Sequence, residues 1–226
     1  LSAGSGNDVF NLSGGAFGIN GQAGNDSLNA TGGSADFISG EGNDTASFMD
    51  RTGSSGTFSF SGDAGTDALI FDLDTSSANI TLSNREIVID GYTVGFTDLV
   101  ETIDLTDIAS QTKFFAGTGT PSYGSAAVTM TLNSLVSTAN MSMGSLALTT
   151  TGNASVAALT STAGGLDLQI GGDFTASDAL TSAEAFILAA NTITVLGGTT
   201  AKNVSINGAG SVTVGSVTST AEGITI

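Results

Sequence analysis

The sequence repeats one short phrase near its start, as Gly6-Asn7-Asp8, Gly24-Asn25-Asp26 and Gly42-Asn43-Asp44. The aspartates of these three copies stand 18 residues apart, twice over. A looser copy, Gly65-Thr66-Asp67, follows after a longer step of 23 residues. A fixed period of this kind is typical of a chain built from stacked, similar units. We therefore expect a solenoid, and the fold class that the sequence predicts is all-β.

Each 18-residue step divides into two units of nine that match the repeat G-G-x-G-x-D-x-U-x, where U is a large apolar residue. The U positions Phe10, Ile19, Leu28 and Phe37 fall nine residues apart and are predicted to stack as the interior. Every second unit keeps its glycines but loses its aspartate. We therefore expect one edge of the roll to bind metal and the other edge to be a glycine turn without metal. Residues 1–71 are thus predicted to form a parallel β-roll.

The repeated aspartates are predicted to bind calcium. Calcium takes six to eight oxygen ligands from carboxylates and carbonyls, and a neighbouring glycine lets the backbone turn its carbonyls towards the ion. One turn supplies half of this ligand shell, and the next coil, about 4.8 Å away, supplies the rest. The column of Asp8, Asp26, Asp44 and Asp67 would make up to three sites between coils. The last site is the least regular, because five extra residues must bulge out within Asp50–Gly62. The other residues predicted to build these metal turns are Gly4, Gly6, Asn7, Gly24, Asn25, Gly40, Gly42, Asn43 and Gly65.

Some of these residues have plainer interpretations. A single Gly-Asn-Asp is also a favourable β-turn, whereas three copies in strict register favour calcium. Asp63, Asp72 and Asp74 are either auxiliary ligands or solvated acids. Glu101 and Asp104 either ligate or cap in a junction strand, or lie on the surface.

Residues 72–107 are predicted to form a β-rich junction. Alternating apolar and polar residues predict strands at Ile80–Leu82, Ile87–Ile89 and Tyr92–Phe96. The segment closes on Leu99–Thr106, a further strand pattern. We expect this closing strand to feed the roll into the next part of the chain.

Residues 108–226 have a longer period, of roughly 20 residues, and three series of short apolar strands. The first series is Leu146–Leu148, Leu166–Leu168, Phe186–Leu188, Val204–Ile206 and Ile224–Ile226. The second is Val156, Phe174, Ile193–Val195 and Val212–Val214, and the weaker third is Leu159, Leu180 and Val217. Three strands per turn, separated by small polar residues, predict a right-handed parallel β-helix.

The two patterns together resemble the RTX family of secreted bacterial proteins. The calcium repeats, followed by the segment Val100-Glu101-Thr102, are similar to RTX-type surface-layer proteins and large secreted adhesins over nearly the whole chain. The resemblance implies a calcium β-roll joined to a β-helix. It also implies export by a type I secretion machine, through a C-terminal signal that this segment does not show, to the extracellular bacterial cell surface.

The composition limits the partners that the chain is expected to bind and the reactions that it is expected to catalyse. The net charge of −17, from 21 acidic and 4 basic residues, disfavours nucleic acid and anionic lipid and suits a divalent cation. No run of about 18 apolar residues is present, so we expect no membrane insertion. Histidine and cysteine are absent, which removes the usual nucleophile–base pairs, and we expect this segment not to be an enzyme.

The function that we expect is structural. An acidic calcium roll joined to a β-helix of low charge suits a self-assembling subunit of a bacterial surface layer or surface fibre. The alternative is a rigid repeat or stalk module of a giant RTX adhesin. Candidate partners are further copies of the chain, in a lattice or filament, and a cell-surface polysaccharide.

Overall fold

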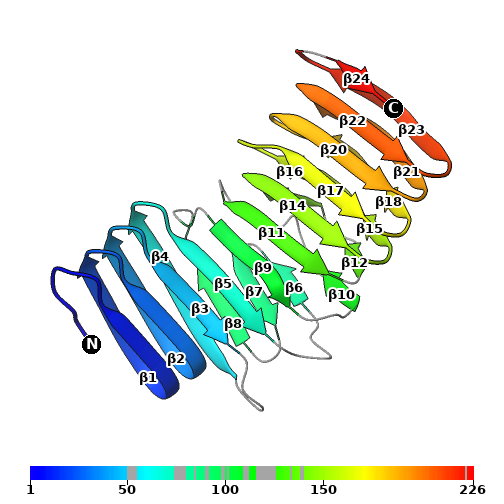
Figure 1. The fold of residues 1–226 in the computed structure, drawn as a ribbon. Coiled ribbons are helices and arrows are strands. Elements are labelled where there is room, and N and C mark those ends of the chain that lie inside the picture. The colour runs from blue at the N-terminus through cyan, green and yellow to red at the C-terminus, as the bar shows by residue number, and fades with distance from the viewer. Residues whose placement is uncertain are drawn as a thin grey trace.

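The chain folds as an all-β solenoid whose coils stack from the N-terminus to the C-terminus (Figure 1). The structure is a computed structural model and describes residues 1–49, 55–73, 80–83, 85–89, 92–97, 100, 102–108, 112–115, 126–132, 134–137, 140–221 and 223–226. Every regular element in these ranges is a β-strand. Each coil passes from one row of paired strands, face 1, to a second row, face 2, and the coils after residue 140 add a short face 3.

The roll begins with two long strands that each cross both faces. Strand β1 (Val9–Ala23) pairs in parallel with β2 (Ser27–Glu41), which places Phe10 opposite Leu28 and Ile19 opposite Phe37. The first half of β2 continues onto face 1, and its second half continues onto face 2. The predicted solenoid of 18-residue coils is therefore confirmed.

Face 1 runs through the whole molecule, and all its strands after β2 pair in parallel. These strands are β3 (Thr45–Met49), β5 (Ala68–Leu73), β9 (Thr102–Ile108), β11 (Ala127–Leu132), β14 (Ser145–Thr150), β17 (Leu166–Ile170), β20 (Ala185–Ala190), β22 (Asn203–Gly208) and β24 (Ile224–Thr225). Strand β9 contains residues 102–106 of the closing pattern of the predicted junction and pairs with the roll on one side and the β-helix on the other. In the sheet, β9 lies between β5 and β11.

Faces 2 and 3 complete the coils. Face 2 contains β4 (Gly56–Ala64), β8 (Tyr92–Phe96), β7 (Glu86–Ile89), β6 (Ile80–Ser83), β10 (Thr112–Phe115), β12 (Ser134–Ser137), β15 (Ala154–Val156) and β18 (Phe174–Ala176). Face 3 contains β13 (Met141–Met143), β16 (Leu159–Ser161) and β19 (Leu180–Thr181). Strands β21 (Ile193–Ala201) and β23 (Val212–Ser219) cross from face 2 to face 3.

The three apolar series of the β-helix lie on its three faces, as predicted. On face 1, Leu146 pairs with Leu166 and that residue with Phe186. On face 3, Leu159 pairs with Leu180. On face 2 the alignment differs by two residues from the prediction, because Ala154 rather than Val156 lies opposite Phe174. The alternation of inward and outward residues is unaffected by that shift.

The interior is a continuous column of apolar side chains. Leu28 and Phe37 are each 1% exposed, and Phe10, on the outermost coil, is partly buried against them. Phenyl rings stack from coil to coil, as for Phe48 and Phe71, whose centroids are 5.1 Å apart. Stacking follows from the parallel register, which places equivalent residues of successive coils about 4.8 Å apart.

Candidate metal centre

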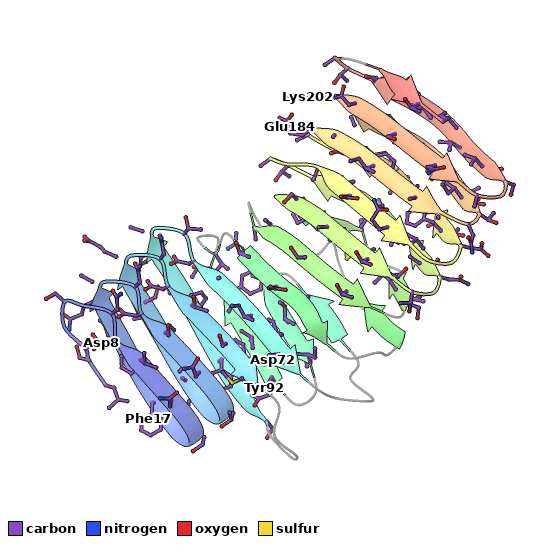
Figure 2. The ribbon with its side chains drawn as sticks, in the orientation of Figure 1. Asp8, Phe17, Asp72, Tyr92, Glu184 and Lys202 are labelled. Atoms are coloured by element: carbon purple, nitrogen blue, oxygen red, sulfur yellow. The ribbon has the colours of Figure 1, made fainter. Side chains whose placement is uncertain are left out.

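The Gly-Asn-Asp turns lie in register at one edge of the roll, where each coil passes from a face 2 strand to a face 1 strand. Backbone hydrogen bonds lock the turns together: the N–H groups of Ser27, Thr45 and Ala68 donate to the carbonyl oxygens of the preceding coil's Asp8, Asp26 and Asp44 at 2.8–2.9 Å. Figure 2 shows Asp8 at the N-terminal end of this stack. The four aspartates that the sequence predicted as a column are therefore brought together.

Glycine is required in these turns by backbone angle and by space. The φ angles of Gly6, Gly24, Gly42 and Gly65 lie between +124° and +145°, a region that side-chain-bearing residues rarely adopt. A Cβ atom on Gly42 would also lie 2.1 Å from the carbonyl oxygen of Gly24, and the equivalent contact at Gly65 would be 1.8 Å. The turns can stack this closely only because these side chains are absent.

The asparagines form a hydrogen-bonded ladder on the outside of the turns. The side-chain oxygen of Asn7 accepts from the backbone N–H of Asn25, and that of Asn25 accepts from Asn43, both at 2.9 Å. The oxygen of Asn43 accepts from the N–H of Thr66 at 2.9 Å. In this arrangement the amide oxygens hold successive coils together, and a role for the asparagines in metal binding stays a prediction.

The aspartates form a second ladder that runs in the opposite direction. Each carboxylate Oδ1 accepts from the backbone N–H of the aspartate on the preceding coil: Asp26 from Asp8 at 2.8 Å, Asp44 from Asp26 at 2.6 Å and Asp67 from Asp44 at 2.9 Å. Asp26 is 1% exposed, and Asp44 and Asp67 are 0% exposed. Ionisable side chains are almost never buried this completely unless something compensates their charge.

The second carboxylate oxygen of the inner aspartates lacks such compensation. The Oδ2 atoms of Asp26 and Asp44 are buried without a hydrogen-bond partner. Burial raises the pKa of Asp26, and the nearby charges of Asp44 and Asp8 raise it further, against the opposing effect of the hydrogen bond from the Asp8 N–H. A buried, unpartnered carboxylate oxygen is costly, and a bound cation would relieve that cost.

A backbone carbonyl lies beside one of these free oxygens. A Cβ atom on Gly21 would lie 2.1 Å from Oδ2 of Asp26 and 2.4 Å from the carbonyl oxygen of Ser39, on the next coil. Gly21 therefore leaves the space in which a carboxylate and a carbonyl of two coils approach each other. Sequence reasoning did not name Gly21 or Ser39, although both occupy the first position of the nonapeptide repeat and that position was available as a signal.

The second position of the repeat adopts the left-handed backbone angle that the motif requires. Gly40 has φ +102°, and Gln22, which replaces glycine there, has φ +78°. A Cβ atom on Gly40 would lie 2.0 Å from the carbonyl oxygen of Gln22, so the coils also approach closely at this position. Gly4, the equivalent residue of the first coil, has open space around its Cβ position.

The residues present fit a hard cation such as calcium. The donor set is paired carboxylates and backbone carbonyls on adjacent coils, all of them oxygen ligands. The step of 23 residues to Asp67 does not break the ladder, since the Asp44–Asp67 hydrogen bond, at 2.9 Å, is still formed beside its neighbours of 2.6 and 2.8 Å. No cluster of three or more Asp, Glu, His or Cys side chains occurs within the described ranges. Backbone carbonyls would therefore have to supply much of each ligand shell.

The other acidic candidates are spread over the surface or lie outside the described residues. Asp63 and Asp72 are exposed, and Asp104 is half-buried on β9. Asp74, Glu101 and residues 50–54, the first part of the stretch Asp50–Gly62 in which the extra residues were expected to bulge, are outside the described residues.

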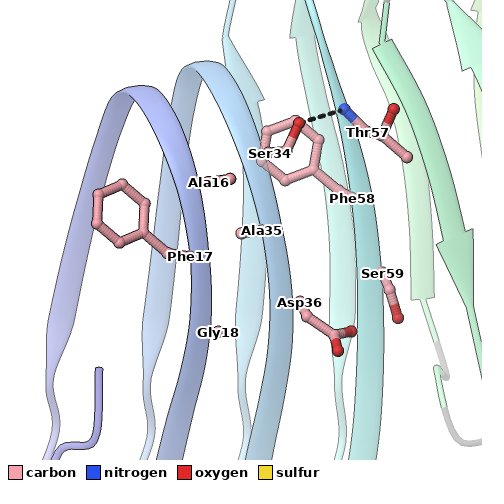
Figure 3. Close-up of a pocket in the computed structure, with 9 residues that line it drawn as sticks. All are labelled: Ala16, Phe17, Gly18, Ser34, Ala35, Asp36, Thr57, Phe58 and Ser59. Carbon is pink, nitrogen blue, oxygen red and sulfur yellow. Dashed lines mark hydrogen bonds between the residues drawn. The ribbon is translucent and has the colours of Figure 1, made fainter.

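A shallow depression of about 490 Å³ marks the opposite part of the roll, over the second halves of β1 and β2 and the first half of β4 (Figure 3). Phe17 is 41% exposed at its margin, and Ser34 Oγ accepts a hydrogen bond from the N–H of Thr57 at 3.2 Å. Asp36 is the one ionisable residue that lines it. These residues offer no convergent ligands, so we place the candidate site at the Gly-Asn-Asp edge.

Comparison with protein-family models, curated proteins and solved structures finds no significant match for this chain. No helix long and apolar enough to span a membrane occurs in the part of the chain that the structure describes. The candidate site therefore rests on the chain's own geometry.

Proposed function

We propose that this chain is a calcium-dependent structural protein of the bacterial cell surface, a subunit that assembles into a surface layer or fibre. The observation that carries the proposal is the aspartate ladder, in which Asp26 and Asp44 bury carboxylate oxygens that no hydrogen bond satisfies. Calcium between adjacent coils would neutralise these charges and join the coils. The resemblance of the repeats to RTX proteins supports the same ion.

The ladder makes folding depend on the ion. Without calcium, like charges on adjacent coils repel, and burying them opposes formation of the roll. With millimolar calcium outside the cell, binding free energy adds to folding free energy, so the roll forms after export. Strand β9 then offers its face 1 edge to β11 and extends the ordered sheet into the β-helix.

The experiment is a calcium titration followed by microscopy. Isothermal titration calorimetry is expected to count two or three ions per chain, and circular dichroism in excess chelator is expected to lose the β signal of the first ~100 residues. Negative-stain images should show ordered assemblies with calcium and none without it. Spectra that are identical in calcium and in chelator would refute the folding switch.

The second candidate function is a stalk module of a large adhesin. The observation that favours it is the continuity of face 1, which runs unbroken from β2 to β24 and suits a stiff rod. Sedimentation velocity separates the two functions, because a lattice or fibre subunit polymerises when calcium is added and a stalk remains a monomer. In neither function does the segment act as an enzyme.

A further inference from the structure

The two faces of the solenoid contain different numbers of strands at the junction between the roll and the β-helix. On face 1, β3, β5, β9 and β11 follow one another, which makes three strand-to-strand steps. On face 2, the described strands of the same coils run β4, β8, β7, β6, β10 and β12. Four of these five steps are hydrogen-bonded ladders, and the fifth, from β6 to β10, is a contact without a ladder. Among the described residues, face 2 therefore has two strands more than face 1 over the same coils.

The extra strands come from a meander, defined here as β6, β7 and β8. Strand β8 pairs in parallel with β4, with Phe58 opposite Val94, and so takes the place of an ordinary coil. Strand β7 pairs antiparallel with β8, and β6 antiparallel with β7. No ladder joins β6 to β10 among the described residues, but these two strands lie in contact, so the meander occupies the space between β4 and β10.

Strands β7 and β8 of the meander have a buried apolar face. The inward side chains Ile87, Ile89 and Val94 are 0% exposed, and Tyr92 is 1% exposed. The Tyr92 ring lies 5.9 Å from the ring of Phe48, and its hydroxyl donates to the carbonyl oxygen of Met49 at 3.0 Å. Such packing ties the meander to the roll and leaves it little freedom to hinge.

We propose that the meander is a rigid wedge that sets a permanent bend between the roll and the β-helix, with face 1 on the inside of the bend. Two additional strands lengthen face 2 by about 10 Å, since strands lie about 4.8 Å apart in a sheet. The two faces are about 10 Å apart, so this excess turns the solenoid axis by roughly 55°. In Figure 1 the coils of the roll and those of the β-helix stack along different directions, on either side of β9.

The consequence is that the two parts of the molecule extend in different directions. A straight solenoid presents both parts along one line, whereas a bent one lets the roll lie against one neighbour while the β-helix points towards another. The wedge contains none of the aspartates of the ladder, so this proposal does not depend on calcium binding. It can therefore be tested separately from the proposed function.

The test measures the length of each face with pairs of spin labels. The chain has no cysteine, so two introduced cysteines label it specifically. One pair, Ser59→Cys with Thr175→Cys, joins outward positions of β4 and β18 on face 2. The matched pair, Ser47→Cys with Asp167→Cys, joins β3 and β17 of the same two coils on face 1.

The wedge predicts unequal distances. Seven steps separate the face 2 labels and five the face 1 labels, which gives about 34 Å and about 24 Å at 4.8 Å per step. Removing residues 80–91, which deletes β6 and β7, should bring both pairs to about 24 Å. Equal distances in the unaltered chain would refute the bend, and a broad face 2 distribution would refute its rigidity. Unchanged distances in a folded deletion variant would show that the meander does not set the angle.

Discussion

The position of an aspartate in the ladder should decide how much calcium-dependent stability its loss removes. Asp26 lies between Asp8 and Asp44, so it faces two of the spaces between coils, whereas Asp67 faces the ladder on one side only. Asp26→Asn keeps the size and one acceptor oxygen of the side chain but removes its charge. We expect Asp26→Asn to abolish two ion sites and Asp67→Asn to abolish one.

The expected size of each loss follows from mass action. A ligand at 100 times its dissociation constant stabilises the folded state by about 2.7 kcal/mol per site. Asp26→Asn should therefore lose about 5 kcal/mol of the calcium-dependent stability, and Asp67→Asn about 2.7 kcal/mol. In chelator the effect of Asp26→Asn should have the opposite sign, and the substitution should stabilise the folded state. The reason is that it removes a buried charge, and burial raises the pKa of Asp26.

Urea unfolding at fixed calcium and in chelator measures these differences, and calorimetry counts the ions that remain. Asp36→Asn is the matched control, since Asp36 is exposed on the same coil and outside the ladder. Equal losses for Asp26→Asn and Asp67→Asn would refute sites shared between coils. A loss of the same size for Asp36→Asn would refute a specific site altogether.

Three further outcomes are expected. Stability should depend on pH in opposite ways with and without calcium, and urea midpoints at a series of pH values measure both slopes. In chelator, the folded-state pKa of Asp26 is raised, so the unfavourable contribution of this carboxylate is complete above that pKa and declines as pH falls towards about 3.9. In calcium, acid displaces the bound ion and so destabilises the folded state. Gly42→Ala should cost about 3 kcal/mol or more, because its Cβ would lie 2.1 Å from a backbone oxygen of the preceding coil at φ +135°, while Gly18→Ala, with open space, should change the urea midpoint little. Phe48→Ala should cost about 3–5 kcal/mol as a fully buried ring, against less than about 1 kcal/mol for the exposed Phe17→Ala, as measured by thermal unfolding; a similar loss for both would contradict the assigned interior.

Much of the stacking was available from the sequence because a parallel solenoid converts sequence period into spatial register. Residues 18 apart in the roll, such as Asp26 and Asp44, must lie on adjacent coils once the coils are parallel. For the same reason the roughly 20-residue series of the β-helix predicted its faces. The error on face 2, where Val156 lies two residues from its predicted alignment, arose because a single apolar residue marks a three-residue strand poorly.

The sequence alone thus determined the solenoid, its two periods, the column of aspartates and the strand that links the two parts. Tertiary structure alone decided three other features: the opposite directions of the asparagine and aspartate ladders, the approach of Ser39 and Asp26 beside Gly21, and the order of the antiparallel meander. Each of these depends on backbone angles and on which strands become neighbours. Periodicity states which residues repeat, but it does not state which way a carboxylate turns or on which face an extra strand is inserted.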